Sequence, residues 1–133
     1  MTKVPLEPAK EARSSISSLV SAKRLEDFFG QKPRLEYPRL SYRSNLITVE
    51  SERKHGNVWL QLMPLDGWAQ LRVQARPFSL LKLDLADISR IHIRKGDVHP
   101  SLVFSFNAAQ VSELVLYLEP SVMVFWGNDP AGH

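Results

Sequence analysis

The sequence has 133 residues, 44% of them apolar, and a formal net charge of +3. This length fits one domain with at most a short appendage, and the apolar content is typical of a folded chain. Without cysteine, the chain has no disulfide, no thiolate zinc site and no cysteine nucleophile. No apolar run is long enough to span a membrane, and residues 1–15 lack the apolar core of a secretory signal. We therefore expect a cytoplasmic protein.

The positive charge is concentrated towards the N-terminus. Residues 1–45 carry nine Lys or Arg against five acidic residues, whereas residues 46–133 carry eight against nine. Together with the apolar patterning, this asymmetry divides the chain into three predicted segments. They are a lead-in with an amphipathic helix (1–31), a basic extended segment (32–44) and a β domain (45–133).

Residues 9–29 are predicted to form one amphipathic helix that ends at Gly30. Four serines between residues 14 and 18 lower its helix propensity, so it needs a surface to pack against. That surface is either the sheet of its own domain or a partner protein. On the second alternative, the residues of the apolar stripe become candidate partner-binding residues: Ile16, Leu19, Val20, Phe28 and Phe29.

The basic segment 32–44 contains two prolines, which disfavour a helix, and interleaves arginines with tyrosines. One interpretation is an extended arm that packs across the domain surface with its tyrosines half-buried. The other is a nucleic-acid-binding segment, because tyrosines stack on bases while arginines contact phosphates. The candidate partner-binding residues here are Arg34, Tyr37, Arg39, Tyr42 and Arg43.

From residue 46 onward, alternating apolar and polar residues predict a meander of antiparallel strands. The clearest strand is Trp68–Ala75, and Pro100 marks a break before the strand that ends at Phe106. Turn signals at short intervals favour an antiparallel sandwich or barrel over parallel βαβ units. We predict a mainly β (α+β) fold with a bent sheet or barrel of six to seven strands.

Residues 107–118 show two competing patterns. Val111, Leu114, Val115 and Leu118 have helical spacing, with Asn107 as a possible N-cap, and this favours a helix. The alternative is a β-hairpin within residues 113–126 that turns at Glu119–Pro120–Ser121. On either interpretation residues 122–126 form a strand.

The stretch SLLKLDLADISRIHIRKGDVHPSLVFSF, followed by the helix predicted at 107–118, resembles the later part of a pleckstrin-homology-like domain. The resemblance covers residues 46–118 and includes the Asp87–Ile91 corner between two strands. It implies a strongly bent antiparallel sheet capped by that helix. The strand VWLQLM carries no Lys or Arg, so the resemblance does not extend to phosphoinositide binding.

The sequence carries no recognisable catalytic or nucleotide-binding motif. Histidines 55, 92, 99 and 133 are dispersed without metal-ligand spacing, and Asp84 and Asp87 have the character of turn residues. We therefore predict no enzymatic activity, no cofactor and no metal site.

Residues 122–126 are apolar on both faces, which predicts that both faces are covered, one of them by helix 9–29 or by a second protein. Trp126 at their end is therefore a further candidate partner-binding residue. The predicted function is a non-enzymatic protein–protein interaction domain, a small subunit or adaptor of a larger assembly. The alternative is a protein that binds nucleic acid or an anionic surface through residues 32–43. The oligomeric state is left open.

Overall fold

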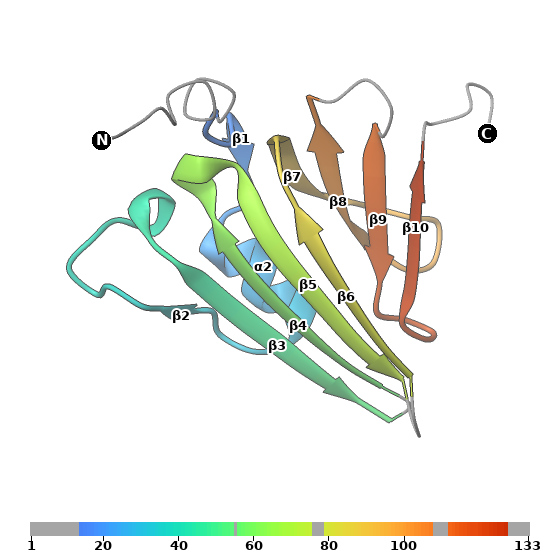
Figure 1. Cartoon of the computed structure of the whole chain (residues 1–133). Helices are drawn as coiled ribbons and strands as arrows, with labels where there is room; N and C mark the ends of the chain where they lie inside the picture. Colours follow the sequence, from blue (N-terminus) through green and yellow to red (C-terminus); the bar gives the residue numbers. More distant parts are fainter. Residues whose placement is uncertain (1–13, 55, 76–78, 108–111, 128–133) are drawn as a thin grey trace.

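The computed structural model describes residues 14–54, 56–75, 79–107 and 112–127. In these residues the chain is mainly β, with two five-stranded sheets and one α-helix, α2 (Figure 1). The first sheet runs in the order β2 (Arg34–Leu35), β3 (Ile47–Arg53), β4 (Gly56–Met63), β5 (Trp68–Ala75), β6 (Ser79–Leu85). The second runs in the order β1 (Ser18–Leu19), β7 (Ile88–Arg94), β8 (Ser101–Phe106), β9 (Glu113–Tyr117), β10 (Met123–Gly127).

The first sheet is an antiparallel meander in which each of the strands β2 to β6 pairs with the next. Its inner face is built by alternation: Val58, Leu60 and Leu62 of β4 are buried, and the residues between them are half-buried. Trp68–Ala75 is the strand that the sequence predicted. The mainly β prediction is thus confirmed, since period-two patterning on a half-buried sheet fixes which residues face the core.

The second sheet corrects the helix predicted at 107–118. Residues 113–117 form the strand β9, which pairs with β8 on one side and with β10 on the other. Leu114, Leu116 and Leu118 are buried while Val115 and Tyr117 are not fully buried, which is the period of a strand. The helical spacing was a coincidence of an apolar-rich segment, and two neighbouring strands supplied the backbone partners that decided the outcome. Residues 108–111 lie outside the described residues.

The two sheets meet at the corner between β6 and β7. Asp87 has a positive φ of 58°, and the Ile88 N–H donates to the Gly67 carbonyl at 3.0 Å. Gly67 itself has φ +62° and lies so close to the chain at Ser14 that a Cβ atom would come within 2.4 Å of a backbone oxygen. In the described residues the sheets stay separate and do not close into a barrel, which corrects that part of the prediction. The resemblance to pleckstrin-homology-like domains stays a prediction.

The predicted helix 9–29 is helical only at α2 (Ala22–Phe29), and residues 9–13 lie outside the described residues. Residues 17–19 run along the second sheet instead, and Ile16 donates from its backbone N–H to the Pro64 carbonyl at 2.8 Å. Ser17 donates from its backbone N–H to the Ser89 carbonyl at 2.8 Å and from its hydroxyl to the same oxygen at 2.9 Å. Ser18 and Leu19 form β1, parallel to β7. Serine side chains compete for backbone partners, so these tertiary hydrogen bonds displace a helix here.

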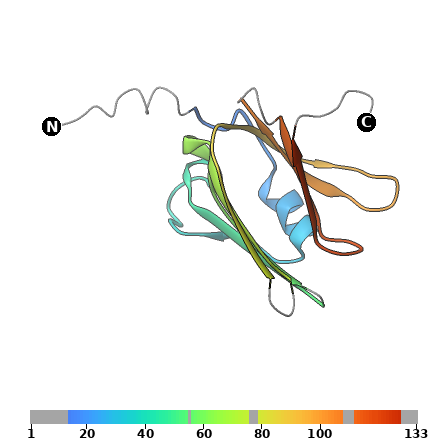
Figure 2. The same cartoon turned by 45° about the vertical axis from the view of Figure 1, so that its right-hand side comes forward.

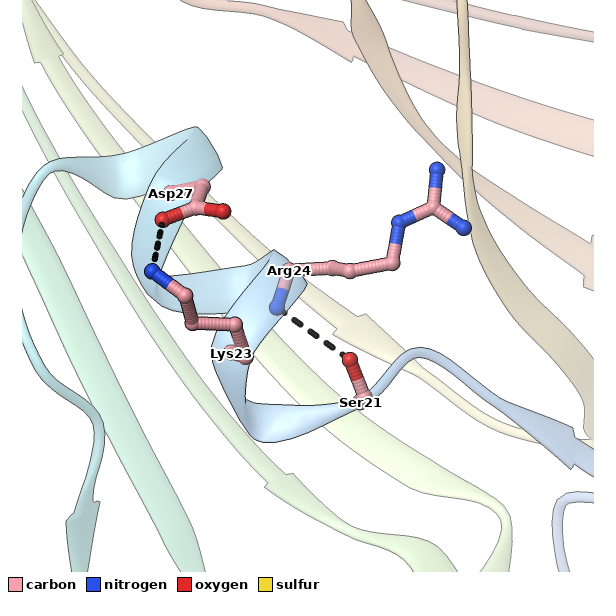
Figure 3. A network of polar contacts seen from close by, with 4 residues as sticks. All are labelled: Ser21, Lys23, Arg24 and Asp27. Carbon is pink, nitrogen blue, oxygen red and sulfur yellow. Dashed lines mark hydrogen bonds and ion pairs between the residues drawn. The ribbon is translucent and has the colours of Figure 1, made fainter.

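Helix α2 begins and ends at conventional caps. The Ser21 hydroxyl accepts a hydrogen bond from the Arg24 N–H at 3.2 Å (Figure 3). Gly30 ends the helix with φ 80°. Figure 3 also shows the exposed pair between Lys23 and Asp27, 3.1 Å apart, with the Arg24 side chain pointing away from it. The buried side of α2 packs into the core that both sheets share, and Figure 2 shows the helix in the opening between them.

Residues from all three predicted segments enter one core. Leu25 and Phe29 of α2 join buried residues of both sheets, and Leu35 of β2 packs against the same cluster. The segment boundaries therefore separate parts of one structural unit. No helix in the described part of the chain is long and apolar enough to cross a membrane.

Candidate protein-binding surface

The basic segment 32–44, called the arm below, is held in place by one buried amide. Asn45 is 2% exposed, and its side chain accepts from the Tyr37 N–H at 2.8 Å. Its Nδ2 atom donates to the carbonyl oxygens of Tyr37, Leu40 and Ser41 at 2.7, 3.2 and 3.2 Å. A single side chain thus satisfies backbone groups along the whole loop 37–41, which gives that loop a defined conformation.

Two predicted site residues tie the arm to the chain before α2. The Tyr42 hydroxyl donates to the Val20 carbonyl at 3.0 Å, and burial raises the pKa of Tyr42 to about 12. Arg43 donates from its guanidinium to the Ile16 carbonyl. These side chains are partners of the protein's own backbone, so both anchor the arm.

The middle of the arm points outward. Tyr37 and Leu40 are about half exposed, at 51% and 47%, and Arg39 between them is also exposed. Arg39 has no ion-pair partner in the described part of the chain, whereas Arg34 lies 3.8 Å from Glu50. The loop 37–41 therefore presents an aromatic ring, a free guanidinium and a leucine on a backbone that Asn45 holds.

A second apolar element lies beside the arm. The short helix η1 (Tyr42–Ser44) lies next to η2 (Pro64–Asp66), and Figure 1 shows the two at the same end of the molecule. Leu65 of η2 is 54% exposed, and Met63 just before it is also exposed. Arm and η2 together form what we call the arm surface. Tyr, Met and Arg are residue types that protein interfaces favour.

The apolar stripe predicted on the N-terminal helix lies inside the protein. Ile16, Val20 and Phe29 are buried in the core, and Leu19 and Phe28 pack partly against it. These residues therefore follow the first of the two alternatives, in which the segment packs on the protein's own sheets and not on a partner. Their side chains are not offered to a partner in this conformation.

Trp126 lies at the opposite, open side of the molecule. The edge strands β6 and β10 border this side (Figure 2). A groove of about 230 Å³ lies between them. The groove walls are mainly apolar: Leu83, Leu85, Phe106, Leu114 and Trp126. We call β6, β10 and this groove the open edge.

The predicted covering of both faces of residues 122–126 is not present within the described chain. Val122 and Val124 pack partly against the core, but Phe125 and Trp126 remain more than half exposed. Phe125 has one aromatic neighbour, Tyr117, in an edge-to-face contact at 6.1 Å. Helix α2 fills the space between the sheets and leaves this strand's outer face open, so covering by a second protein stays a prediction.

The outer face of the second sheet carries a small charged cluster. Arg94 of β7 pairs with Glu113 of β9 at 2.8 Å, which places the ion pair across the intervening strand and over the fully buried Val103. His92 lies directly opposite Val103. Burial, and then the charges of Arg90 and Arg94, lower the pKa of His92. This histidine stands on a sheet face outside the cavities described above.

Sequence reasoning missed Asn45, Met63 and Leu65. Asn45 lies just before an apolar strand and follows a loop that contains proline and tyrosine. An asparagine in this position is a signal for a side chain that hydrogen-bonds the backbone of a turn. The exposure of Leu65 followed only from the tertiary arrangement. Among the described residues, no three His, Cys, Asp or Glu side chains gather into a group that could hold a metal.

These features define a mainly β protein of two sheets with a helix between them and two apolar surface regions. A chain from a solved contact-dependent growth inhibition toxin–immunity protein complex of Klebsiella pneumoniae 342 has a similar fold, with a TM-score of 0.70. The two chains are 14% identical, and the match covers 84% of this chain and 96% of that chain. No family model matches the sequence, and no curated protein matches it.

Proposed function

We propose that this chain is a non-enzymatic protein-binding subunit that recognises a partner protein through the arm surface. The observation that supports this best is the loop 37–41, whose backbone is held by Asn45 while Tyr37, Arg39 and Leu40 stay exposed. A loop fixed before binding loses little conformational entropy when the complex forms. Aromatic and arginine side chains are the usual energetic centres of protein interfaces.

We further propose that the complex is a stoichiometric pair of the toxin–immunity kind, with this chain in the immunity role. The similar fold of a chain from such a complex supports the pairing, and the absence of any recognisable catalytic motif in the sequence favours the binding-only role. Binding without chemistry needs only a complementary surface. A cytoplasmic location is part of the same proposal.

The charge of the arm indicates what the partner surface should carry. The arm has four basic residues against one acidic residue, so its charge alone equals the net charge of the whole chain. Arg34 and Arg43 are already engaged, which leaves Lys32 and Arg39 to face a partner. We expect an acidic protein surface with an apolar depression for Tyr37 or Leu40.

The experiment captures the partner from the source cells with the tagged full chain and identifies it by mass spectrometry. The complex is then reconstituted from the two purified proteins, and its stoichiometry and dissociation constant are measured. Tyr37→Ala and Arg39→Ala should each weaken binding about tenfold or more. The matched control Arg90→Ala removes an exposed arginine of the other sheet and should change the affinity little.

Two outcomes would overturn the proposal. In the first, the reconstituted complex is insensitive to both arm variants. In the second, the captured material is RNA or DNA, and binding weakens steeply with salt because counterions are released. That second outcome would establish the alternative, nucleic-acid binding through residues 32–43.

A further inference from the structure

Strand β6 is an unpaired edge of the first sheet in the described structure. It is seven residues long and contains no proline, and Leu80 and Leu81 are both exposed. One side of its backbone bonds to β5, so the N–H and C=O groups of the other side point outward. An edge with these properties is a template for a further strand.

The faces of β6 are assigned by its register with β5. Leu81, Leu83 and Leu85 lie opposite inner residues of β5, and Leu83 and Leu85 line the groove that Trp126 borders. Lys82 and Asp84 lie on the outer face. A strand added to β6 would continue both faces, placing its own apolar residues beside the groove.

The charges on β6 select one self-pairing. If two copies pair antiparallel with Leu83 opposite Leu83, each Lys82 faces the Asp84 of the other copy, and the apolar residues 81 and 85 face one another. A pairing centred on Lys82 would instead set two lysines opposite each other, which is destabilising. The favourable contact occurs twice because the arrangement is two-fold symmetric.

The surroundings of Lys82 within one chain also favour this pairing. Within one chain, Lys82 lies directly opposite Arg72 of β5, a pair of like charges. Arg72 stacks on Trp59 at 3.7 Å from the ring centre, and Lys82 has no ion-pair partner in the part of the chain that is described. Asp84 accepts one hydrogen bond, from Gln70 at 2.7 Å, through a single carboxylate oxygen. Lys82 thus lacks a negative neighbour, and the other oxygen of Asp84 is available to provide one.

We propose that the occupant of this edge is a second copy of the chain. The two first sheets join edge to edge through antiparallel β6 strands centred on Leu83. The pairing satisfies the outward backbone groups of both strands and brings apolar side chains of each copy next to the other's groove. It uses none of the arm surface, so it is independent of the proposed function.

The test is sedimentation equilibrium of the full chain over a wide concentration range. The wild type should populate a species of twice the chain mass. Lys82→Asp and Asp84→Lys should each raise the dimer dissociation constant about tenfold, because both cross-strand pairs become repulsive. The double variant, which exchanges the two charges, should restore dimerisation. The control Lys95→Asp changes an exposed lysine outside β6 and should have no effect.

Three results would overturn the proposal. A chain that stays monomeric at every concentration excludes the dimer. A dimer that tolerates the single charge changes, or that the double exchange does not restore, uses another surface. Finally, β6 amides protected from hydrogen exchange only when the partner protein is bound would assign the edge to that partner.

Discussion

The arm surface and the open edge both expose apolar side chains, but their backbones differ in how far their hydrogen-bonding groups are paired. In the arm, the side chain of Asn45 hydrogen-bonds four backbone groups of the loop 37–41, so the exposed side chains are the main groups left to be recognised. At the open edge, one side of the β6 backbone has no partner in the described residues.

The difference indicates two kinds of recognition. A loop with satisfied backbone groups suits a partner that reads side chains, with affinity dominated by a few anchors. A free strand edge suits pairing through main-chain hydrogen bonds, with specificity from alternate side chains. One small domain can thus carry two interfaces without either competing for the same groups.

The largest effect on stability is expected from a substitution that removes the hydrogen bonds holding the arm. Asn45→Ala removes four hydrogen bonds to part-buried backbone groups of the loop, so we expect a loss of roughly 2–4 kcal/mol in the free energy of unfolding. Urea denaturation measures it. The control Asn107→Ala loses one long contact to Ser14, at 3.4 Å, and should cost less than about 0.5 kcal/mol. Equal effects of the two variants would contradict the assigned role of Asn45.

A smaller effect is expected at the open edge. Leu80 is 64% exposed, so Leu80→Ala should change the free energy of unfolding by no more than about 0.5 kcal/mol when measured at low protein concentration. Leu60→Ala is the matched comparison, because Leu60 lies fully buried on β4, the strand next to β5. This substitution should lower the free energy of unfolding by about 2–5 kcal/mol. A large loss for Leu80→Ala would mean that the edge side chains support the fold.

The smallest effect concerns His92, which belongs to neither region. Its pKa is lowered from 6.5 in the folded protein, so the unfolded chain takes up a proton at a higher pH than the folded chain does. The contribution of neutral His92 to the free energy of unfolding is fully present above pH 6.5 and is lost as the pH falls below that value. His92→Gln should therefore flatten the pH dependence of unfolding in this window, as measured by urea denaturation at several pH values. An unchanged slope in His92→Gln would assign the dependence to other groups.

Sequence patterning was most reliable where one sheet face is buried. The alternation in Trp68–Ala75 predicted β5 with its bounds. The prolines of the arm disfavoured a helix, and the arm contains only the three-residue 3-10 helix η1. Ser21 and Gly30 cap the two ends of α2, and the preference of these residue types for cap positions depends only on nearby residues. These features depend on neighbours within a few residues, so the sequence contains the information they need.

The sequence by itself determined a mainly β chain, the approximate strand ranges, a helix ending at Gly30 and a basic arm. Only the tertiary structure decided that Ser18 and Leu19 pair with β7 and that residues 113–117 form a strand. Both segments could satisfy their backbone groups in either conformation, and the choice depended on which distant strands were present to accept hydrogen bonds. The same holds for the two surfaces: Asn45 acts on the arm, and Trp126 borders a groove with β6, only because folding brings them together.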